Sequence, residues 1–400
     1  MKIVVLVGDG MGDYPVKELG DKSPLQAAHA PMLRKIAAAG EVRMVQTVPE
    51  GLPPGSDVAN MALMGYNALE NYTGRAPIEA AGADITMNND EIAFRCNLVT
   101  VENGFMKDYS AGHISTDEAS VLISALHDAL EETDVKLYTG VQYRHLLIWK
   151  NGPSKLVCNP PHEIADKMIN DYLPKGFHAD ALINIMEKSK SVFSDHPVNK
   201  KRIEEGKLPA TQVWLWGQGG SIKLDSYQHL YGLGGGVISA VDLLKGLAKL
   251  AGLSAPNIEG ATGLIDTNYA GKVSEAINIL QKEDFAYLHI EAPDECGHMG
   301  DALLKTKAIE LFDQHVCVPM IEWLQNNKEA YVVILCMDHR TPVALRGHTS
   351  EPVPMAIMYG PVDYLDQEMP FDESINNGIA ECMACDWIRE ILKKATTSKD

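Results

Sequence analysis

The chain has 400 residues, of which 46% are hydrophobic and 22% charged, and its formal net charge is −19. This composition excludes a wholly disordered chain, and the acidic balance argues against a nucleic-acid partner, because phosphate backbones select basic surfaces. A chain of this length is expected to hold one large domain and a second, smaller unit.

The cysteines and the apolar runs indicate the cellular compartment in which the protein is expected. Seven cysteines are spread along the chain without the dense spacing of a secreted disulfide framework, which predicts a reducing environment. The apolar start, residues 1–9, is too short for a signal peptide, and no later run approaches the roughly 18 apolar residues of a membrane span. We therefore expect a cytoplasmic protein without a membrane partner. Cys382 and Cys385 have the spacing of a redox motif but lie in a stretch that is typical of a helix.

Apolar, β-branched runs recur along the chain. The first, 3–7, ends at Gly8-Asp9-Gly10, as a buried parallel strand does where it meets an active-site loop. Further strands are predicted at 42–48, 212–216, 285–290, 331–337 and 355–359, and helices at 31–39, 239–251, 272–281, 303–325 and 378–394. The alternation predicts an α/β fold with a doubly wound, mostly parallel sheet. Ligands of such sheets bind beyond the carboxyl ends of the strands.

The middle of the chain has a different pattern. Residues 85–148 are predicted as strand, turn, helix and strand, with Ser115 or Thr116 as the N-cap of the helix. Lysine-rich helices are predicted within 160–206, and the glycine-rich stretch 231–239 is interpreted as a loop. We predict that 86–208 form a smaller α/β domain, for substrate binding or as a lid, inserted into a core of 1–85 and 209–400.

Aspartates and histidines follow several of the predicted strands. Asp294 and His298 are four residues apart, so on a helix they share one face and can bind one cation. The other members of the set are Asp9, Asp338, His339 and His348. Helix capping and ordinary buried histidines are the alternatives for each residue alone. Together, three carboxylates in one pocket would raise each other's pKa and cost stability, so the set predicts two divalent cations.

Ser56 follows a Pro-Pro-Gly loop and precedes an apolar-periodic helix. Its hydroxyl is expected at the helix N-terminus, where the macrodipole favours negative charge. Capping of the helix is the structural alternative. Beside a cation the same hydroxyl is a candidate nucleophile toward a phosphoryl group, and such a nucleophile argues against a metal-storage protein.

Four segments resemble a known family. VGDGMGD, LPPGSDVANMALMGY, APDECGHMGD and DHRTPVALRGHTSEPVP, in this order, resemble the alkaline-phosphatase superfamily, and specifically its archaeal-type cofactor-independent phosphoglycerate mutases. The resemblance covers nearly the whole chain, including YTGVQYRHLLIW and HPVNKKRIEEGK. It implies interconversion of 2-phosphoglycerate and 3-phosphoglycerate through a transiently phosphorylated Ser56.

The resemblance also implies two metal sites. The first would consist of Asp294, His298 and His348, and the second of Asp9, Ser56, Asp338 and His339. Mn or Zn is expected there, and Mg or Co is compatible with the same ligands.

The sequence departs from the family where the substrate is selected. Gly74-Arg75-Ala76 stands where well-known members have Gly-Arg-Gly, Asp338-His339-Arg340 stands for Asp-His-Ser, and Gly219-Gly220 lacks the basic residue expected soon after. Bacterial relatives with the VNKKRIE and WLWGQG pattern have been proposed to act as homoserine kinases. ATP-dependent phosphorylation of homoserine is therefore the alternative function. The chain has no P-loop, which favours the mutase, although this superfamily handles phosphoryl groups with metals rather than with a glycine cradle.

A small phosphorylated or carboxylate-bearing substrate needs cationic partners. Guanidinium groups suit carboxylate and phosphate alike. The candidates are Arg75, Arg95, His113, Arg144, His145, Lys200, Lys201 and Arg346. Solvated surface charge is the alternative, particularly for the two lysines. Asp108 and His113 flank a loop that could relay protons. Homoserine would instead need an acidic partner for its ammonium group, for which Asp108, Asp117 and Glu118 are the candidates.

Overall fold

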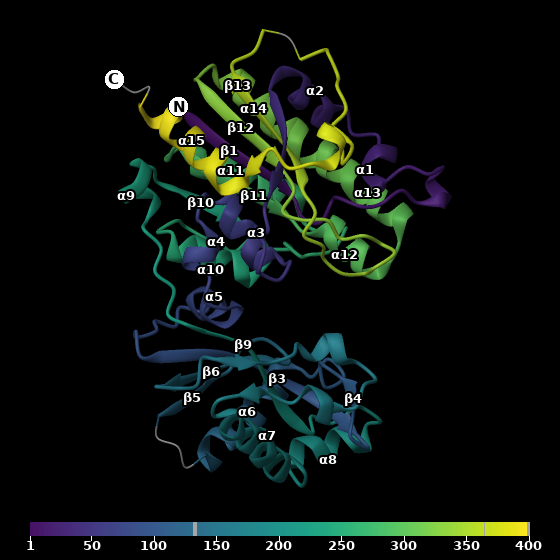
Figure 1. Cartoon of the computed structure of the whole chain (residues 1–400), viewed down its shortest axis with the longest axis vertical. Helices are drawn as coiled ribbons and strands as arrows, with labels where there is room; N and C mark the ends of the chain where they lie inside the picture. Colours follow the sequence, from purple (N-terminus) through teal and green to yellow (C-terminus); the bar gives the residue numbers. More distant parts are fainter. Residues whose placement is uncertain (131–133, 364, 398–400) are drawn as a thin grey trace. The chain divides into compact units, whose positions relative to one another are not determined.

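The computed structural model describes residues 1–130, 134–363 and 365–397 (Figure 1). The chain forms two units, one of residues 1–72 and 223–400 and one of residues 73–222. The second unit is longer at both ends than the predicted insertion at 86–208. The reason is that the helix at Arg75–Gly82 and the strand at Gln212–Gly220 pack on, or pair with, the strand at Glu91–Glu102.

The first unit is built on a seven-stranded sheet with the order β10-β11-β1-β12-β13-β2-β14. Its strands are β1 (Lys2–Gly8), β2 (Glu41–Gln46), β10 (Gly235–Ile238), β11 (Phe285–Ile290), β12 (Tyr331–Cys336), β13 (Val353–Gly360) and β14 (Cys382–Met383). β10, β11, β1 and β12 run parallel, which confirms the predicted α/β class, whereas β13 is antiparallel to both of its neighbours. No crossover helix separates β12 from β13, so the chain returns in the opposite direction.

The helices of the first unit differ from the prediction at two places. They are α1 (Pro24–Ala27), α2 (Pro31–Ala39), α3 (Ser56–Leu63), α4 (Ala68–Asn71), α9 (Tyr227–Tyr231), α10 (Asp242–Leu250), α11 (Tyr269–Leu280), α12 (Ala292–Met299), α13 (Ala302–Phe312), α14 (Val318–Asn327) and α15 (Ala384–Thr397), with short turns at Lys17–Leu19, Asp313–Cys317 and Ile375–Gly378. The predicted helix 303–325 is α13 and α14, joined by one turn of π-helix. The helix predicted from 378 begins at Ala384, because Cys382 lies in β14. One strand was also missed, since β10 replaces part of the predicted glycine loop.

The second unit has an antiparallel sheet in the order β4-β3-β6-β5. A further strand, β9, pairs with β3 along the edge opposite to β6. Its strands are β3 (Glu91–Glu102), β4 (Phe105–Asp108), β5 (Val135–Tyr138), β6 (Arg144–Lys150) and β9 (Gln212–Gly220), with a small pair, β7 (Leu156–Val157) and β8 (Lys175–Gly176). Its helices are α5 (Arg75–Gly82), α6 (Thr116–Ala129), α7 (Ala179–Phe193) and α8 (Pro197–Glu204), with 3-10 turns at Pro161–Ile164 and Ile169–Tyr172. The prediction of a parallel core strand at 212–216 was wrong, because this segment pairs antiparallel with β3.

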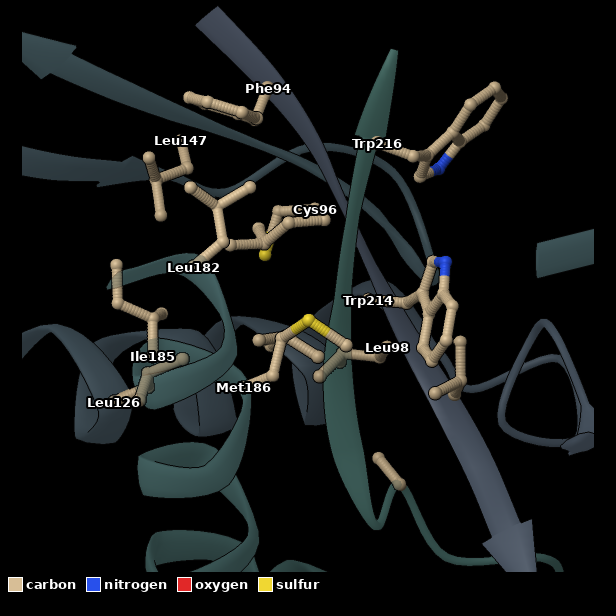
Figure 2. Close-up of a cluster of buried hydrophobic side chains, with 14 of the residues drawn as sticks. Phe94, Cys96, Leu98, Leu126, Leu147, Leu182, Ile185, Met186, Trp214 and Trp216 are labelled. Carbon is tan, nitrogen blue, oxygen red and sulfur yellow. The ribbon is translucent and has the colours of Figure 1, made fainter. Parts of the chain in front are cut away.

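Successive side chains of β3 lie on opposite faces of the sheet, and those on one face enter the hydrophobic core of the second unit. Phe94 and Cys96 are fully buried in one cluster with Leu182 and Ile185 of α7. Figure 2 shows Trp214 and Trp216 on the other side of β9 from these α7 residues. Because side chains alternate along a strand, Arg95 lies on the opposite face of β3 from Phe94 and Cys96. The predicted start of α6 is confirmed, since the Ser115 side chain accepts a hydrogen bond from the Glu118 backbone and Glu118 returns one.

His145 belongs to the helix-facing side of this sheet. It pairs in register with Cys96, and its side chain is 2% exposed. Its Nδ1 accepts a hydrogen bond from the Gly140 amide at 3.0 Å, and burial lowers its pKa from 6.5 to about 4. The structure therefore gives His145 a packing position on the face away from Arg95.

Acidification should destabilise the second unit through His145. The unfolded residue binds a proton near pH 6.5 while the folded one stays neutral down to about pH 4, so its contribution is intact above pH 6.5 and falls as the pH drops toward 4. The expected loss at pH 5 is about 2 kcal/mol. Denaturant unfolding at pH 7 and pH 5 should show a smaller pH effect for His145→Gln than for wild type. His127→Gln, at an exposed position of α6, is the matched control, and an equal pH effect in all three proteins would contradict the prediction.

Within the described ranges, no helix combines the length and the apolar character that crossing a bilayer requires.

Candidate functional site

Polar side chains gather where β1, β11 and β12 end. Asp9 follows β1, Asp294 lies in α12 just after β11, and Asp338 with His339 follows β12. The three strands are parallel and adjacent, with Gly8 opposite Ile290 and Val7 opposite Cys336. Their carboxyl ends therefore lie at one edge of the sheet. The long segment after His339 returns His348 to the same place.

The first group consists of Asp294, His298 and His348. The Nε2 atom of His298 lies 3.2 Å from Asp294 Oδ2, one helical turn earlier in α12, and 3.0 Å from the Nε2 atom of His348. His348 Nε2 lies 3.4 Å from Asp294 Oδ1. The Nδ1 atom of His298 is 3.0 Å from the Arg346 carbonyl. A carbonyl only accepts, so Nδ1 donates to it, and Nε2 is the ring nitrogen that faces the group.

The second group consists of Asp9, Asp338 and His339, whose ligand atoms lie within 4.8 Å of one another. His339 Nε2 is 3.6 Å from Asp9 Oδ1 and 3.4 Å from Asp338 Oδ2. His339 also lies within the same distance of Asp294 and His348, so it stands between the two groups. Asp338 is firmly held, because its oxygens accept hydrogen bonds from the amides of Gly10 and His339 and from Asn60.

The electrostatics of the second group favour a cation. Asp9 is buried, and its Oδ1 atom has no hydrogen-bond partner among the described residues. Burial, followed by the charges of Asp338 and Asp294, raises the pKa of Asp9 well above its ordinary value. Burial also lowers the pKa of His339 to about 4, so the imidazole is neutral, as a metal ligand must be. An orphaned carboxylate oxygen beside neutral imidazole nitrogen matches the donors that Mn and Zn use.

Ser56 is the first residue of α3, and its hydroxyl faces this group. The N-cap of α3 is Gly55, so the capping alternative for Ser56 was wrong. Its Oγ atom instead lies 3.2 Å from His339 Nε2. Asn60, one turn later, donates to both the Ser56 carbonyl and Asp338 Oδ2, and thereby ties the helix start to the carboxylate.

Three of the predicted substrate-binding arginines meet in the second unit around Glu79. Arg75 Nε lies 3.0 Å from one Glu79 oxygen and Arg95 Nε 2.8 Å from the other. Burial of Glu79 opposes its ionisation, but the charges of Arg95, Arg75 and then Arg144 lower its pKa below the ordinary value. The Arg95 guanidinium also lies 4.2 Å above the Trp216 ring. The cluster carries three positive charges and one negative charge.

The other predicted substrate residues lie elsewhere. Lys200 forms an exposed ion pair with Asp195 at 3.2 Å, and Lys201 an exposed one with Glu205 at 3.8 Å, as the surface alternative expects. Arg346 is in the first unit, has a φ of 54°, and its carbonyl contacts His298.

The loop of Asp108 and His113 is closed by its own hydrogen bonds. Asp108 Oδ1 accepts from the Ser110 amide and hydroxyl and from the Gly112 amide, while the His113 amide donates to Ser110 Oγ. Burial opposes ionisation of Asp108, but these bonds lower its pKa below the ordinary value.

Several residues around the site were missed by sequence reasoning. Thr341 donates to Asp294 Oδ1, and Tyr287 donates to Asn60 at 2.5 Å. His289 and Glu291 are buried behind Asp9. Of these residues, only His289 had a signal in the sequence, because it is a histidine within the otherwise apolar run of β11.

Arg340, which directly follows His339, contacts the backbone of a later segment. Its side chain donates two hydrogen bonds to the Pro352 carbonyl, at 3.1 and 2.8 Å.

Comparisons with known proteins identify the family of this chain. The family model of 2,3-bisphosphoglycerate-independent phosphoglycerate mutase matches residues 37–199. A 2,3-bisphosphoglycerate-independent phosphoglycerate mutase of Methanosarcina mazei is 46% identical over 380 residues, which cover 94% of this chain and 96% of the relative. A solved protein of Pyrococcus horikoshii superposes with a TM-score of 0.80 at 26% identity, covering 100% of this chain and 98% of that one. The cofactor-independent phosphoglycerate mutase of Thermoplasma acidophilum shares the fold, with a TM-score of 0.61 at 23% identity over 99% of this chain and 100% of its own. The chain belongs to the 2,3-bisphosphoglycerate-independent phosphoglycerate mutase family.

Proposed function

We propose that this protein interconverts 2-phosphoglycerate and 3-phosphoglycerate through a phosphoserine at Ser56, without 2,3-bisphosphoglycerate. The observation that carries the proposal is the position of the Ser56 hydroxyl, at the N-terminus of α3 and 3.2 Å from His339 in the buried Asp9–Asp338–His339 group. A nucleophile there would serve no purpose in a storage protein. The 46% identity to a named mutase over 94% of the chain supports the same reaction.

Two divalent cations fit the proposed reaction. Asp294, His298 and His348 would hold the first, and Asp9, Ser56, Asp338 and His339 the second. Mn or Zn suits these donors best, while Mg and Co are compatible. When bound, the ions would offset the three buried carboxylates, lower the pKa of the serine hydroxyl and stabilise charge on the phosphoryl oxygens.

The chain's own residues then carry out two transfers. In the first, a bond forms between Ser56 Oγ and phosphorus while the bond from phosphorus to the glycerate oxygen breaks. The serine loses its proton and the glycerate oxygen gains one. In the second, the neighbouring hydroxyl of glycerate attacks the phosphoserine, loses its proton, and Ser56 is restored with one.

The second unit would supply the groups that bind the substrate. Arg75, Arg95 and Arg144 act on one carboxylate, that of Glu79, and guanidinium groups of this kind suit a small dianion. The stacking of Arg95 on Trp216 keeps its guanidinium in one orientation. Arg144 is the exposed member and is thus open to a ligand.

Replacing Arg144 with methionine is expected to raise the KM for 3-phosphoglycerate at least about tenfold, because a charge-assisted contact contributes about 1.5–3 kcal/mol. Methionine retains much of the aliphatic stem, so the thermal unfolding of the second unit should change little. Lys190→Met, which removes an exposed lysine paired with Glu187 on α7, is the matched control. A KM for Arg144→Met equal to that of Lys190→Met would remove Arg144 from the binding site.

The substrate assignment is tested by two assays run in parallel. One supplies 3-phosphoglycerate alone, without nucleotide or 2,3-bisphosphoglycerate, and follows 2-phosphoglycerate through enolase. The other supplies homoserine and ATP. We expect turnover in the first assay only. ATP-dependent formation of phosphohomoserine, without turnover of 3-phosphoglycerate, would replace the mutase with the kinase.

A further inference from the structure

A chain of buried polar side chains contacts Asp9 at Oδ2, whereas His339 contacts its other oxygen, Oδ1. His289 Nε2 is 3.3 Å from Asp9 Oδ2. His289 is in β11, directly opposite Val7 of β1, and its side chain is 0% exposed. The register of two neighbouring parallel strands therefore sets this contact.

The other ring nitrogen of His289 faces a second fixed group. Its Nδ1 atom lies 3.5 Å from Glu291 Oε1 and 3.5 Å from Ser239 Oγ. Glu291 is held in turn by the Ser239 hydroxyl at 2.7 Å, the Ala240 amide at 2.6 Å and the ammonium group of Lys272. Lys272 is also 0% exposed. Three donors from two other segments thus fix the carboxylate that orients the imidazole.

The two aspartates of the second group are supported differently. Asp338 accepts hydrogen bonds from two backbone amides and from Asn60. Asp9 has no such support among the described residues: Oδ1 has no hydrogen-bond partner, and Oδ2 lies 3.3 Å from His289 Nε2 in an ion-pair contact, a ring nitrogen that itself has no hydrogen-bond partner. The orientation of the Asp9 carboxylate therefore depends on the imidazole.

We propose that His289 is a positioning residue, which holds Asp9 in the orientation needed to bind the cation of the second group, and that Glu291, Ser239 and Lys272 hold His289. This inference rests on the proposed function only through that cation. Partners behind metal ligands usually contribute about 10- to 100-fold to metal affinity. The effect should be confined to the second group, because Asp294, His298 and His348 do not contact His289 in the described structure.

The test compares His289→Gln with His289→Asn in metal-free full-length protein titrated with MnCl2 by calorimetry. The glutamine amide nitrogen is as many bonds from Cα as Nε2 and can reach Asp9, whereas the asparagine amide ends at the level of Nδ1. The two amides are otherwise alike, so they form a matched pair. We expect His289→Gln to bind two Mn²⁺ with nearly wild-type affinities, and His289→Asn to bind one of the two about 10- to 100-fold more weakly.

Other results would overturn the inference. Equal weakening in both variants, weakening of both sites, or two unchanged sites in His289→Asn would each show that the imidazole does not position Asp9. Wild type that binds no Mn²⁺ would instead overturn the cation pair of the proposed function, and this inference with it. If thermal unfolding shows that His289→Asn does not fold, Ser239→Ala serves in its place. It removes one donor to Glu291 and should weaken the same single site several-fold, and unchanged binding would contradict the proposal.

Discussion

Replacing Ser56 with alanine is expected to lower kcat at least about 10³-fold, because the reaction loses its phosphoryl acceptor. The free energy of unfolding should stay nearly unchanged, since Gly55 is the N-cap and the Ser56 hydroxyl makes no capping hydrogen bond. Intact-mass measurement after addition of 3-phosphoglycerate should show one phosphoryl group on wild type and none on the variant. Turnover comparable to wild type would leave the hydroxyl without a chemical role.

Ser226→Ala is the matched control for this experiment. Ser226 is in the same unit and is a true N-cap, whose hydroxyl accepts a hydrogen bond from the His229 amide at 3.2 Å. Its replacement should cost about 1 kcal/mol of stability and leave kcat unchanged. The two serines should therefore dissociate the two effects, with Ser56 needed for turnover and Ser226 for stability.

Removal of divalent cations is expected to abolish turnover, and addition of Mn²⁺ or Zn²⁺ should restore it. The physical reason is the concentration of Asp9, Asp294 and Asp338 in one buried cluster, where burial and mutual repulsion raise the pKa of Asp9. Mn²⁺ at 100 times its Kd should stabilise the folded chain by about 2.7 kcal/mol per site. Three measurements test the prediction. They are activity after dialysis against chelator, metal content by elemental analysis, and thermal unfolding with and without Mn²⁺.

Two variants show whether the effect belongs to this cluster. Asp338→Asn removes the charge of a fully buried member of the proposed second metal site and should prevent reactivation by Mn²⁺. Asp386→Asn, at the exposed start of α15 and 3.6 Å from Arg389, should reactivate as wild type does. A metal-free protein with full activity would refute the cation pair for both groups.

Much of the core fold could be predicted from local pattern. β1, β11 and β12 are buried along nearly their whole length and therefore appear as continuous apolar runs, whose short length favours strands over helices. β10 could not be predicted, because its glycines are typical of a loop. A Cβ at Gly235 would lie 2.1 Å from the Phe285 carbonyl oxygen, so the close pairing of β10 with β11 requires the residue that made the segment resemble a loop.

The direction in which two of the strands pair could not be predicted from the sequence either. Residues 212–216 and 353–360 have the apolar character of strands, and local pattern identifies both. Their antiparallel pairing with β3 and β12 depends on how far the connecting segments reach, which hydrophobic periodicity does not record.

For the site, the sequence by itself determined the donor types and the Asp294–His298 pair, because four residues on a helix place two side chains on one face. The tertiary structure decided everything that depends on distant segments. It placed His339 between the two groups, and Glu79 among the arginines. It also placed His289 beside Asp9, although 279 residues separate them in the chain. The contact of His289 with Asp9 follows from the register of β11 and β1, which brings strand ends together whatever their separation in sequence. Glu79 meets Arg75 within α5, and it meets Arg95 because α5 packs on β3.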